Sequence, residues 1–421
     1  MTLRNFTRLA VVDITPLRQV PGYRWLFAGM LFMHTGRQLT VVAVPFQVYE
    51  ITGSTLMVGL LGLGQLIPLL AVSMIGGALA DAVDRRRLLL LSQMLLAATA
   101  LGLLWNSVTP VPAVWPLFVL SGINAGVSAI DSPARQAIVP GLVGRALLPS
   151  ALALNQTLVN TAKAAIPALG GLLIAIAGLP FSYGTETVLF LISGVLLSRL
   201  PDVRIEGGGR KFGLDSIMEG FRALKPRRLI QATFLLDLNA MVFGMPTALF
   251  PAFGTATLGG DAFTVGLLYA APGIGALLGA VTSGWVPSVR RQGRAVIIAI
   301  IGWGVAITIF GFANSVPIAL LMLGLAGAAD VVSAIFRQAI VQLTIPDALR
   351  GRLSSMHMAV TAGGPRLGEL EAGVVASLTS VRFSVISGGL ACILGTFAIA
   401  RWSPRILSYE YDPDKPELGE G

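Results

Sequence analysis

Twelve apolar segments of similar length run through this chain, and they constrain its fold more than any other feature. A helix needs roughly 20 residues to cross the hydrocarbon core of a bilayer. Charged residues make up only 12% of the 421 positions and hydrophobic residues 54%, whereas a soluble domain has about 25% charged residues. We therefore predict an all-α membrane protein with twelve transmembrane helices. The segments cover 25–49, 56–80, 87–106, 112–131, 150–178, 182–200, 229–253, 263–286, 294–313, 316–340, 354–378 and 382–402.

The links between these segments alternate in charge. Links after odd-numbered segments contain one basic residue, Arg382, whereas links after even-numbered segments are rich in Arg and Lys, including Arg85, Arg135 and Arg290. Because Lys and Arg stay on the cytoplasmic side, we expect a multi-pass protein of the cell (inner or plasma) membrane with both termini in the cytoplasm. The net charge of +9 then reflects topology and contact with membrane lipid, and we expect no nucleic-acid partner.

The two halves of the chain repeat each other. The sequence Arg135 to Val139 recurs as Arg337 to Val341, an offset of 202 residues, and Gly77 falls on Gly279 at the same offset. Parallel repeats of six helices build one large class of transporters, so we predict two pseudo-symmetric six-helix bundles. The expected domains are a first bundle at 1–200, a cytoplasmic linker with an amphipathic helix at 201–228, a second bundle at 229–404, and an acidic tail at 405–421.

The link between the second and third segments has the densest cluster of charge. Asp81, Asp84 and the run Arg85 to Arg87 lie within a few residues, and such charges must sit at the membrane surface, where they can pair. At the repeat offset, Asp81 falls on Ser283, so the second copy lacks this acid. We expect an acid-bearing cytoplasmic gate in the first half alone. The candidate gating residues are Gly77, Asp81, Asp84, Arg85, Arg86, Arg87 and Arg135 in the first half, with Arg337 as the second-half copy of Arg135.

This cluster carries a resemblance to a known family. The pattern from Gly77 to Arg87 resembles the signature that the major facilitator superfamily places between its second and third helices, although Asp84 replaces a glycine. The stretch Ile166 to Gly171 resembles the motif of its drug-antiporter branches, with Ile166 in place of a glycine. The resemblance implies that Pro167, Gly170 and Gly171 form a helix-bend motif.

Two further stretches are similar to one branch of that superfamily. Val44 to Tyr49 and Ser132 to Ala137, together with Gly266 to Gly273, resemble the enterobactin-exporter-like group, which includes macrolide-efflux relatives. In the superfamily, the first, fourth, seventh and tenth helices line a central cavity. The resemblance therefore implies that His34, Arg37, Asp237 and Asp330 lie near the transport pathway.

Ionisable residues inside the apolar segments are the candidates for chemistry, because charge within a membrane is costly and is kept for function. The set for proton coupling or a substrate cavity is His34, Arg37, Asp237, Asp330, Arg366, Glu369 and Glu371. Several interpretations stay open. Asp237 could titrate in a cavity or form a structural ion pair, Arg366 and Glu369 could pair for packing or for binding, and His34 could be a hydrogen-bonded structural residue. Glu186 is expected at the membrane interface.

No G-x-x-x-x-G-K-[ST] loop is present, so we expect no ATP site. We also expect no enzymatic activity, no metal site and no cofactor, with the proton gradient as the energy source. The predicted function is export of a small organic solute, either a siderophore or a hydrophobic drug, by proton antiport with alternating access. The alternatives are import of a small nutrient, proton-coupled or facilitative, and a non-transporting membrane sensor. We expect a monomer that binds a small-molecule substrate.

Overall fold

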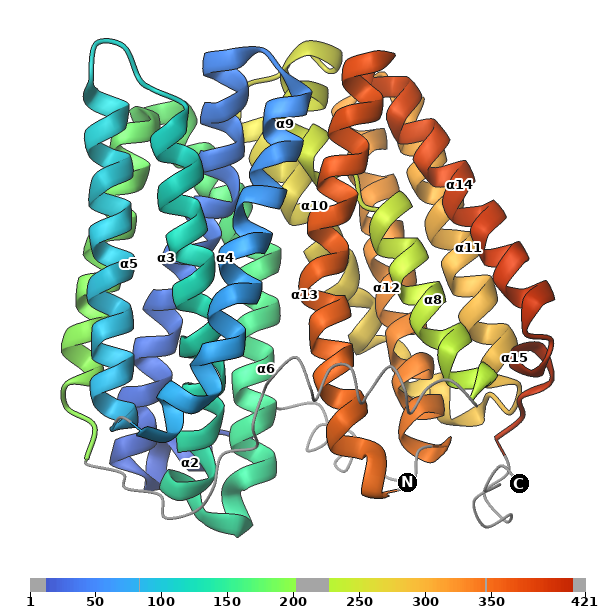
Figure 1. The fold of residues 1–421 in the computed structure, drawn as a ribbon, viewed down its shortest axis with the longest axis horizontal. Helices are drawn as coiled ribbons and strands as arrows, with labels where there is room; N and C mark the ends of the chain where they lie inside the picture. The colour runs from blue at the N-terminus through green and yellow to red at the C-terminus, as the bar shows by residue number, and fades with distance from the viewer. Residues whose placement is uncertain (1–12, 83, 202–226, 345–346, 412–421) are drawn as a thin grey trace, which may run out of the picture.

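The structure is a computed structural model that describes residues 13–82, 84–201, 227–344 and 347–411 (Figure 1). Within these ranges, the side chains at 74–82, 287, 347–356, 358 and 359 are outside the description. The predicted linker helix falls on residues 202–226 and most of the acidic tail on 412–421, which also lie outside the described residues. The domain limits therefore stay predictions.

All regular structure in the described ranges is helical. The first half contains α2 (Thr15–Gln19), α3 (Pro21–Thr52), α4 (Thr55–Ala82), α5 (Arg85–Val108) and α6 (Trp115–Leu197). The second half contains α8 (Arg228–Phe243), η1 (Thr247–Leu249), α9 (Phe250–Ala252), η2 (Phe253–Thr257), α10 (Ala262–Val281), η3 (Ser283–Ser288), α11 (Gln292–Gly311), α12 (Val316–Thr344), α13 (Asp347–Leu378), α14 (Val381–Trp402) and α15 (Arg405–Ser408).

Helix α6 is 83 residues long but crosses the molecule three times. The backbone is not helical at Gly144, with φ 70°, or at Gly178, with φ 80°, and glycine adopts such positive φ angles without steric cost. The chain turns at these two positions. We call the three sections α6a (115–143), α6b (145–177) and α6c (179–197).

The two halves form two helical bundles that stand side by side. Figure 1 shows α3 to α6, in blue to green, beside α8 to α14, in yellow-green to red. Eight helices in the described ranges are long and apolar enough to cross a membrane. Among these, α6 counts once but crosses three times, and the more polar α3 and α13 add the remaining two spans. The predicted architecture of twelve transmembrane helices in two six-helix bundles is confirmed.

The two ends of the bundles can be told apart by the first and last described helices. Helices α2 and α15 both lie at the lower end in Figure 1, which we call the terminal side. We call the opposite end the far side. Helix α3 runs from the terminal side to the far side, and α4 returns, so the start of α4 lies at the far side.

Each half has its own packed core, and the outer surface is apolar as well. In the second half, the rings of Phe253 and Phe310 lie 4.4 Å apart between centroids. In the first half, Tyr23 is fully buried and its hydroxyl donates to the carbonyl of Ala151. On the outside, Ile176 is 76% exposed. Apolar residues are stable there because lipid tails are as apolar as leucine side chains.

Two predicted segment boundaries were wrong. The fourth segment was expected to end at residue 131, but α6a continues to residue 143, so Arg135 lies inside a membrane helix instead of in a cytoplasmic link. The eighth segment was expected to reach residue 286, but α10 ends at Val281 and is followed by the short 3₁₀ helix η3. Charged residues near the end of an apolar segment make its boundary hard to predict. A buried ion pair allows the helix to continue past them, as Asp131 and Arg135 do in α6a.

Candidate functional site

The two halves meet through close helix contacts near the far side. Section α6b packs on α10 with Gly171 against Gly266, and α4 packs on α13 with Gly59 against Gly373. A Cβ on Gly171 would lie 2.7 Å from the Cα of Gly266, and a Cβ on Gly373 would lie 2.9 Å from the Cα of Gly59. Only glycine permits such a close approach of two backbones. These contacts close the far side between the halves.

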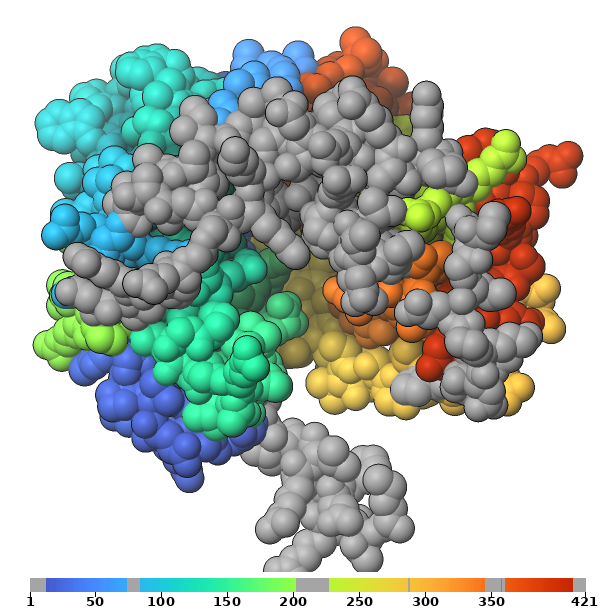
Figure 2. All heavy atoms as spheres, turned by 60° about the horizontal axis from the view of Figure 1, so that its bottom comes forward, coloured from blue at the N-terminus to red at the C-terminus, as the bar shows by residue number. Residues whose placement is uncertain are grey.

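The predicted helix-bend motif lies in this contact. The carbonyl oxygen of Pro167 would meet a Cβ on Gly266 at 2.5 Å, and a Cβ on Gly170 would meet the side chain of Leu39 on α3 at 3.1 Å. The motif therefore presses α6b against the other half on one face and against α3 on another. On the terminal side, in contrast, Figure 2 shows the surface hollowed between the green α6 and the yellow segments of the second half.

A cavity lies between the halves, below the far-side contacts. Its polar wall contains Arg37, Thr40, Gln65 and Asn124 from the first half and Tyr269, Arg366 and Glu369 from the second. Of the seven candidate coupling residues, the structure thus brings Arg37, Arg366 and Glu369 to one cavity. These side chains reach it because α3, α4, α6a, α10 and α13 all turn one face toward the midline.

The Arg366–Glu369 pair serves both packing and the cavity wall. One guanidinium nitrogen of Arg366 lies 3.0 Å and 3.1 Å from the two carboxylate oxygens of Glu369. Thr247 also donates to Glu369, and a Cβ on Gly62 of α4 would collide with that carboxylate. The pair therefore fills the contact between α4 and α13 while facing the cavity. The two interpretations that the sequence left open describe one arrangement.

Asp237 lies in a buried ion pair. Its carboxylate is 2.8 Å from the guanidinium of Arg337 on α12, and the two residues are 4% and 8% exposed. Asp330, two helical turns before Arg337 on α12, lies 3.9 Å from the same guanidinium, with its side chain 43% exposed. Arg337, which the sequence assigned to the cytoplasmic gate, is thus held inside the second half by two acids.

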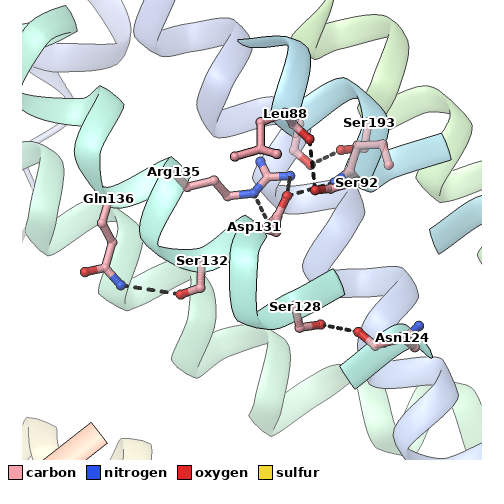
Figure 3. Close-up of polar contacts among 11 residues, drawn as sticks. Leu88, Ser92, Asn124, Ser128, Asp131, Ser132, Arg135, Gln136 and Ser193 are labelled. Carbon is pink, nitrogen blue, oxygen red and sulfur yellow. Dashed lines mark hydrogen bonds and ion pairs between the residues drawn. The ribbon is translucent and has the colours of Figure 1, made fainter. Parts of the chain in front are cut away.

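Arg135 has a matching pair in the first half (Figure 3). Its guanidinium contacts the carboxylate of Asp131, one turn earlier on α6a, at 2.5 Å and 3.1 Å. Gln93 of α5 donates to the same carboxylate at 3.2 Å. Asp131 was missed by the sequence analysis, because the fourth segment was ended at that residue. The i, i+4 spacing of Asp131 and Arg135 was the available signal.

The two halves keep the arginine and change its partner. Arg135 and Arg337 are equivalent at the offset of 202, but Asp131 corresponds to Ser333. Asp237, in turn, corresponds to Thr35. A buried arginine is thus neutralised within its own bundle in both halves, from its own helix in the first and from α8 in the second. This placement gives each bundle an internal ionic lock.

The arginine cluster after α4 is bound to the first half. The Asp84 side chain caps α5 by accepting from the backbone N–H of Arg86 at 2.8 Å. Arg85 donates to the carbonyl of Ala137 on α6a, and Arg86 donates to the carbonyl of Ser198 after α6c. Gly77 and the side chain of Asp81 fall in the stretch 74–82, whose side chains are outside the description. The cluster ties three helices of one bundle together, and its role as a gate stays a prediction.

Three further candidates are separate from these pairs. His34 is half-buried one turn before Arg37 on α3, and Glu371 is half-buried on α13 without a hydrogen bond or ion pair to any described residue. Glu186 was expected at the membrane interface, and this was wrong. Its side chain is fully buried in α6c and accepts a hydrogen bond from Thr40. Its position near one end of the apolar segment did not show which face of the helix it occupies.

Comparison with known proteins agrees with this architecture. A family model described as transmembrane secretion effector matches residues 12–414. The enterobactin exporter EntS of Citrobacter koseri is 29% identical over 390 residues, which cover 91% of this chain and 92% of that protein. Among solved structures, the nucleoside transporter NupG has a TM-score of 0.70 at 14% identity, over 90% of this chain and 98% of that chain.

A second solved structure has the same fold. A bacterial homolog of the human lysosomal transporter Spinster, in an inward-facing conformation, has a TM-score of 0.72 at 14% identity, over 93% of this chain and 99% of that chain. Major facilitators are transporters that bind a small-molecule substrate, so the expectation that this protein is not an enzyme is confirmed. The chain belongs to the transmembrane secretion effector family of the major facilitator superfamily.

Proposed function

We propose that this transporter exports a small organic solute from the cytoplasm across the cell membrane by proton antiport. The observation that carries the proposal is the cavity between the halves, which is closed toward the far side and lined by charged groups from both bundles. With both termini in the cytoplasm, this is the state in which an exporter takes up its substrate. Similarity to enterobactin exporters over 91% of the chain supports export of a siderophore-like solute.

The proposed cycle moves the two bundles as rigid bodies about the cavity. The internal ionic locks, Asp131–Arg135 and Asp237–Arg337, keep each bundle intact while the far-side contacts open. The charged cluster from Asp81 to Arg87 would then close the cytoplasmic side. Proton coupling is assigned to Glu371 first, because a coupling role for Asp237 requires its pair with Arg337 to break.

Transport in reconstituted vesicles tests direction and coupling together. Purified protein is inserted into liposomes with an acidic lumen, and uptake of radiolabelled enterobactin and of the dye Hoechst 33342 is measured for molecules whose cytoplasmic side faces outward. Exchange of one proton gives about tenfold accumulation per pH unit. An uncoupler should abolish the uptake of the transported probe. Accumulation driven by an alkaline lumen would instead support the import alternative.

Replacement of Glu371 by Gln tests the coupling residue in the same vesicles. We expect downhill exchange of the probe to continue and uphill accumulation to disappear, because the amide cannot carry the proton. Glu410 is a suitable control, since its carboxylate is exposed and pairs with Arg291 at the terminal side. Uphill accumulation by Glu371→Gln equal to that of the wild type would show that the coupling assignment is wrong.

A further inference from the structure

Arg37 is a cation at the middle of the membrane without a counter-ion of its own. It lies near the centre of α3 and lines the cavity between the halves. In the described part of the chain, its guanidinium makes no hydrogen bond and no ion pair. A charge at this depth is costly unless it is paired or hydrated. The protein therefore keeps an unneutralised arginine at the place where a transported solute would bind.

The acids around Arg37 are already engaged. Asp131 is the acid whose charge acts on Arg37, and it is held by Arg135 at 2.5 Å. Glu369 of the opposite wall is held by Arg366 through both carboxylate oxygens. Each acid is thus neutralised by a closer arginine, and neither can satisfy Arg37.

Other cations add to the positive charge of this region. Arg366 acts electrostatically on Arg37 across the cavity, and Lys163 of α6b is also close enough to interact with it. Asp330 partly offsets Lys163, but it also lies near Arg337. His34, one turn from Arg37, is also acted on by three cations, Arg37, Arg135 and Lys163. Arg366 and Lys163 therefore add positive charge near Arg37 and do not neutralise it.

We propose that Arg37 is the binding site for an oxyanion of the substrate, and that the exported solute is an amphiphilic organic anion. A guanidinium fork binds a carboxylate or a similar oxyanion through two parallel hydrogen bonds. Thr40 and Asn124 offer further polar contacts beside it, while Val41, Val58 and Leu61 supply an apolar wall for the rest of the molecule. This inference rests on the proposed transport cavity and specifies the class of its substrate.

Binding to the purified protein in detergent tests this inference without any need for transport. The probes are three matched pairs in which one carboxylate is either free or esterified: 2-naphthoate, 1-pyrenebutyrate and fluorescein, each with its methyl ester. We expect at least one carboxylate to bind at least tenfold more tightly than its ester, since hydrogen bonds to charged groups are the stronger ones. Arg37→Gln should bring that ratio to about one, and Arg37→Lys should keep part of it.

The variants include controls for charge and for structure. Arg401→Gln removes an exposed arginine at the end of α14 and should leave the ratio unchanged. Arg37→Gln should not lower the thermal stability of the empty protein, because no internal pair is lost. A ratio of one in the wild type for all three pairs, or a tenfold ratio that persists in Arg37→Gln, would overturn the inference. Failure of export or of proton coupling in vesicles would not change these binding ratios, so the two proposals can fail separately.

Discussion

Replacement of Gly171 by leucine is expected to abolish transport while leaving the protein folded in the membrane. A Cβ at this position would lie 2.5 Å from the carbonyl oxygen of Ala262 and 2.7 Å from the Cα of Gly266. Both atoms belong to the backbone of α10, so no side-chain rotation relieves the clash. Overpacking costs about 1–3 kcal/mol, and a backbone clash belongs at the upper end. The state closed on the far side should become roughly a hundredfold less populated.

Accessibility of a cavity cysteine measures this change directly. Val41→Cys places a thiol in the cavity wall, and Cys392→Ala removes the single natural cysteine. A membrane-impermeant maleimide added from the far side should label the cysteine slowly in this background and rapidly after Gly171→Leu. Gly184→Leu is the control, because nothing lies within 4 Å of a Cβ at that position of α6c. Equal labelling in all three proteins would mean that the glycine contact does not close the far side.

Replacement of Asp237 by Asn is expected to destabilise the second bundle strongly. The change leaves Arg337 buried at 8% exposure without its partner at 2.8 Å. Removal of one member of a buried ion pair costs about 3–5 kcal/mol, because the remaining charge is uncompensated. Thermal unfolding in detergent should therefore begin at a clearly lower temperature, and the yield of folded protein should fall.

Two further variants separate the pair from its surroundings. Asp330→Asn should have a smaller effect, because its carboxylate is 3.9 Å from Arg337 and its side chain is 43% exposed. The double change of Asp237 and Arg337 to Asn and Gln should recover part of the stability lost by Asp237→Asn alone, since the buried charge of Arg337 is then removed as well. If Asp237→Asn is as stable as the wild type, the pair is not a structural lock, and Asp237 returns as a candidate for proton coupling.

The same two pairs show how far sequence reasoning reached. The repeat of Arg135 at Arg337 was visible from the sequence, and it correctly indicated two related bundles. The partners were not visible, because Asp237 is 100 positions before Arg337 and its counterpart in the first half is Thr35. For Asp131 the signal was local, but it was lost when the helix was ended too early. A charge inside a membrane helix is tolerated when it is paired, and the sequence alone does not show which residue is the partner.

The cavity residues divide in the same way. The depth of Arg37, Arg366 and Glu369 in their helices followed from counting residues along apolar segments. Which of them faces the midline did not, because a helix presents all its faces within one turn and only the neighbouring helices decide which face is covered. Glu186 illustrates this limit, since it was expected at the membrane interface but is fully buried in the first bundle beside Thr40.

The sequence by itself determined the all-helical class, the twelve spans, the twofold repeat and the family. These are properties of segment length, composition and short motifs. An apolar segment long enough to cross the bilayer must form a helix, because its backbone groups find no water to bind there. Only the tertiary structure decided that Gly171 meets Gly266, that Arg337 is neutralised by Asp237, and that Arg37 has no ion-pair partner among the described residues. Those features depend on contacts between helices far apart in the chain, where a rotation of one helix by half a turn would exchange every partner.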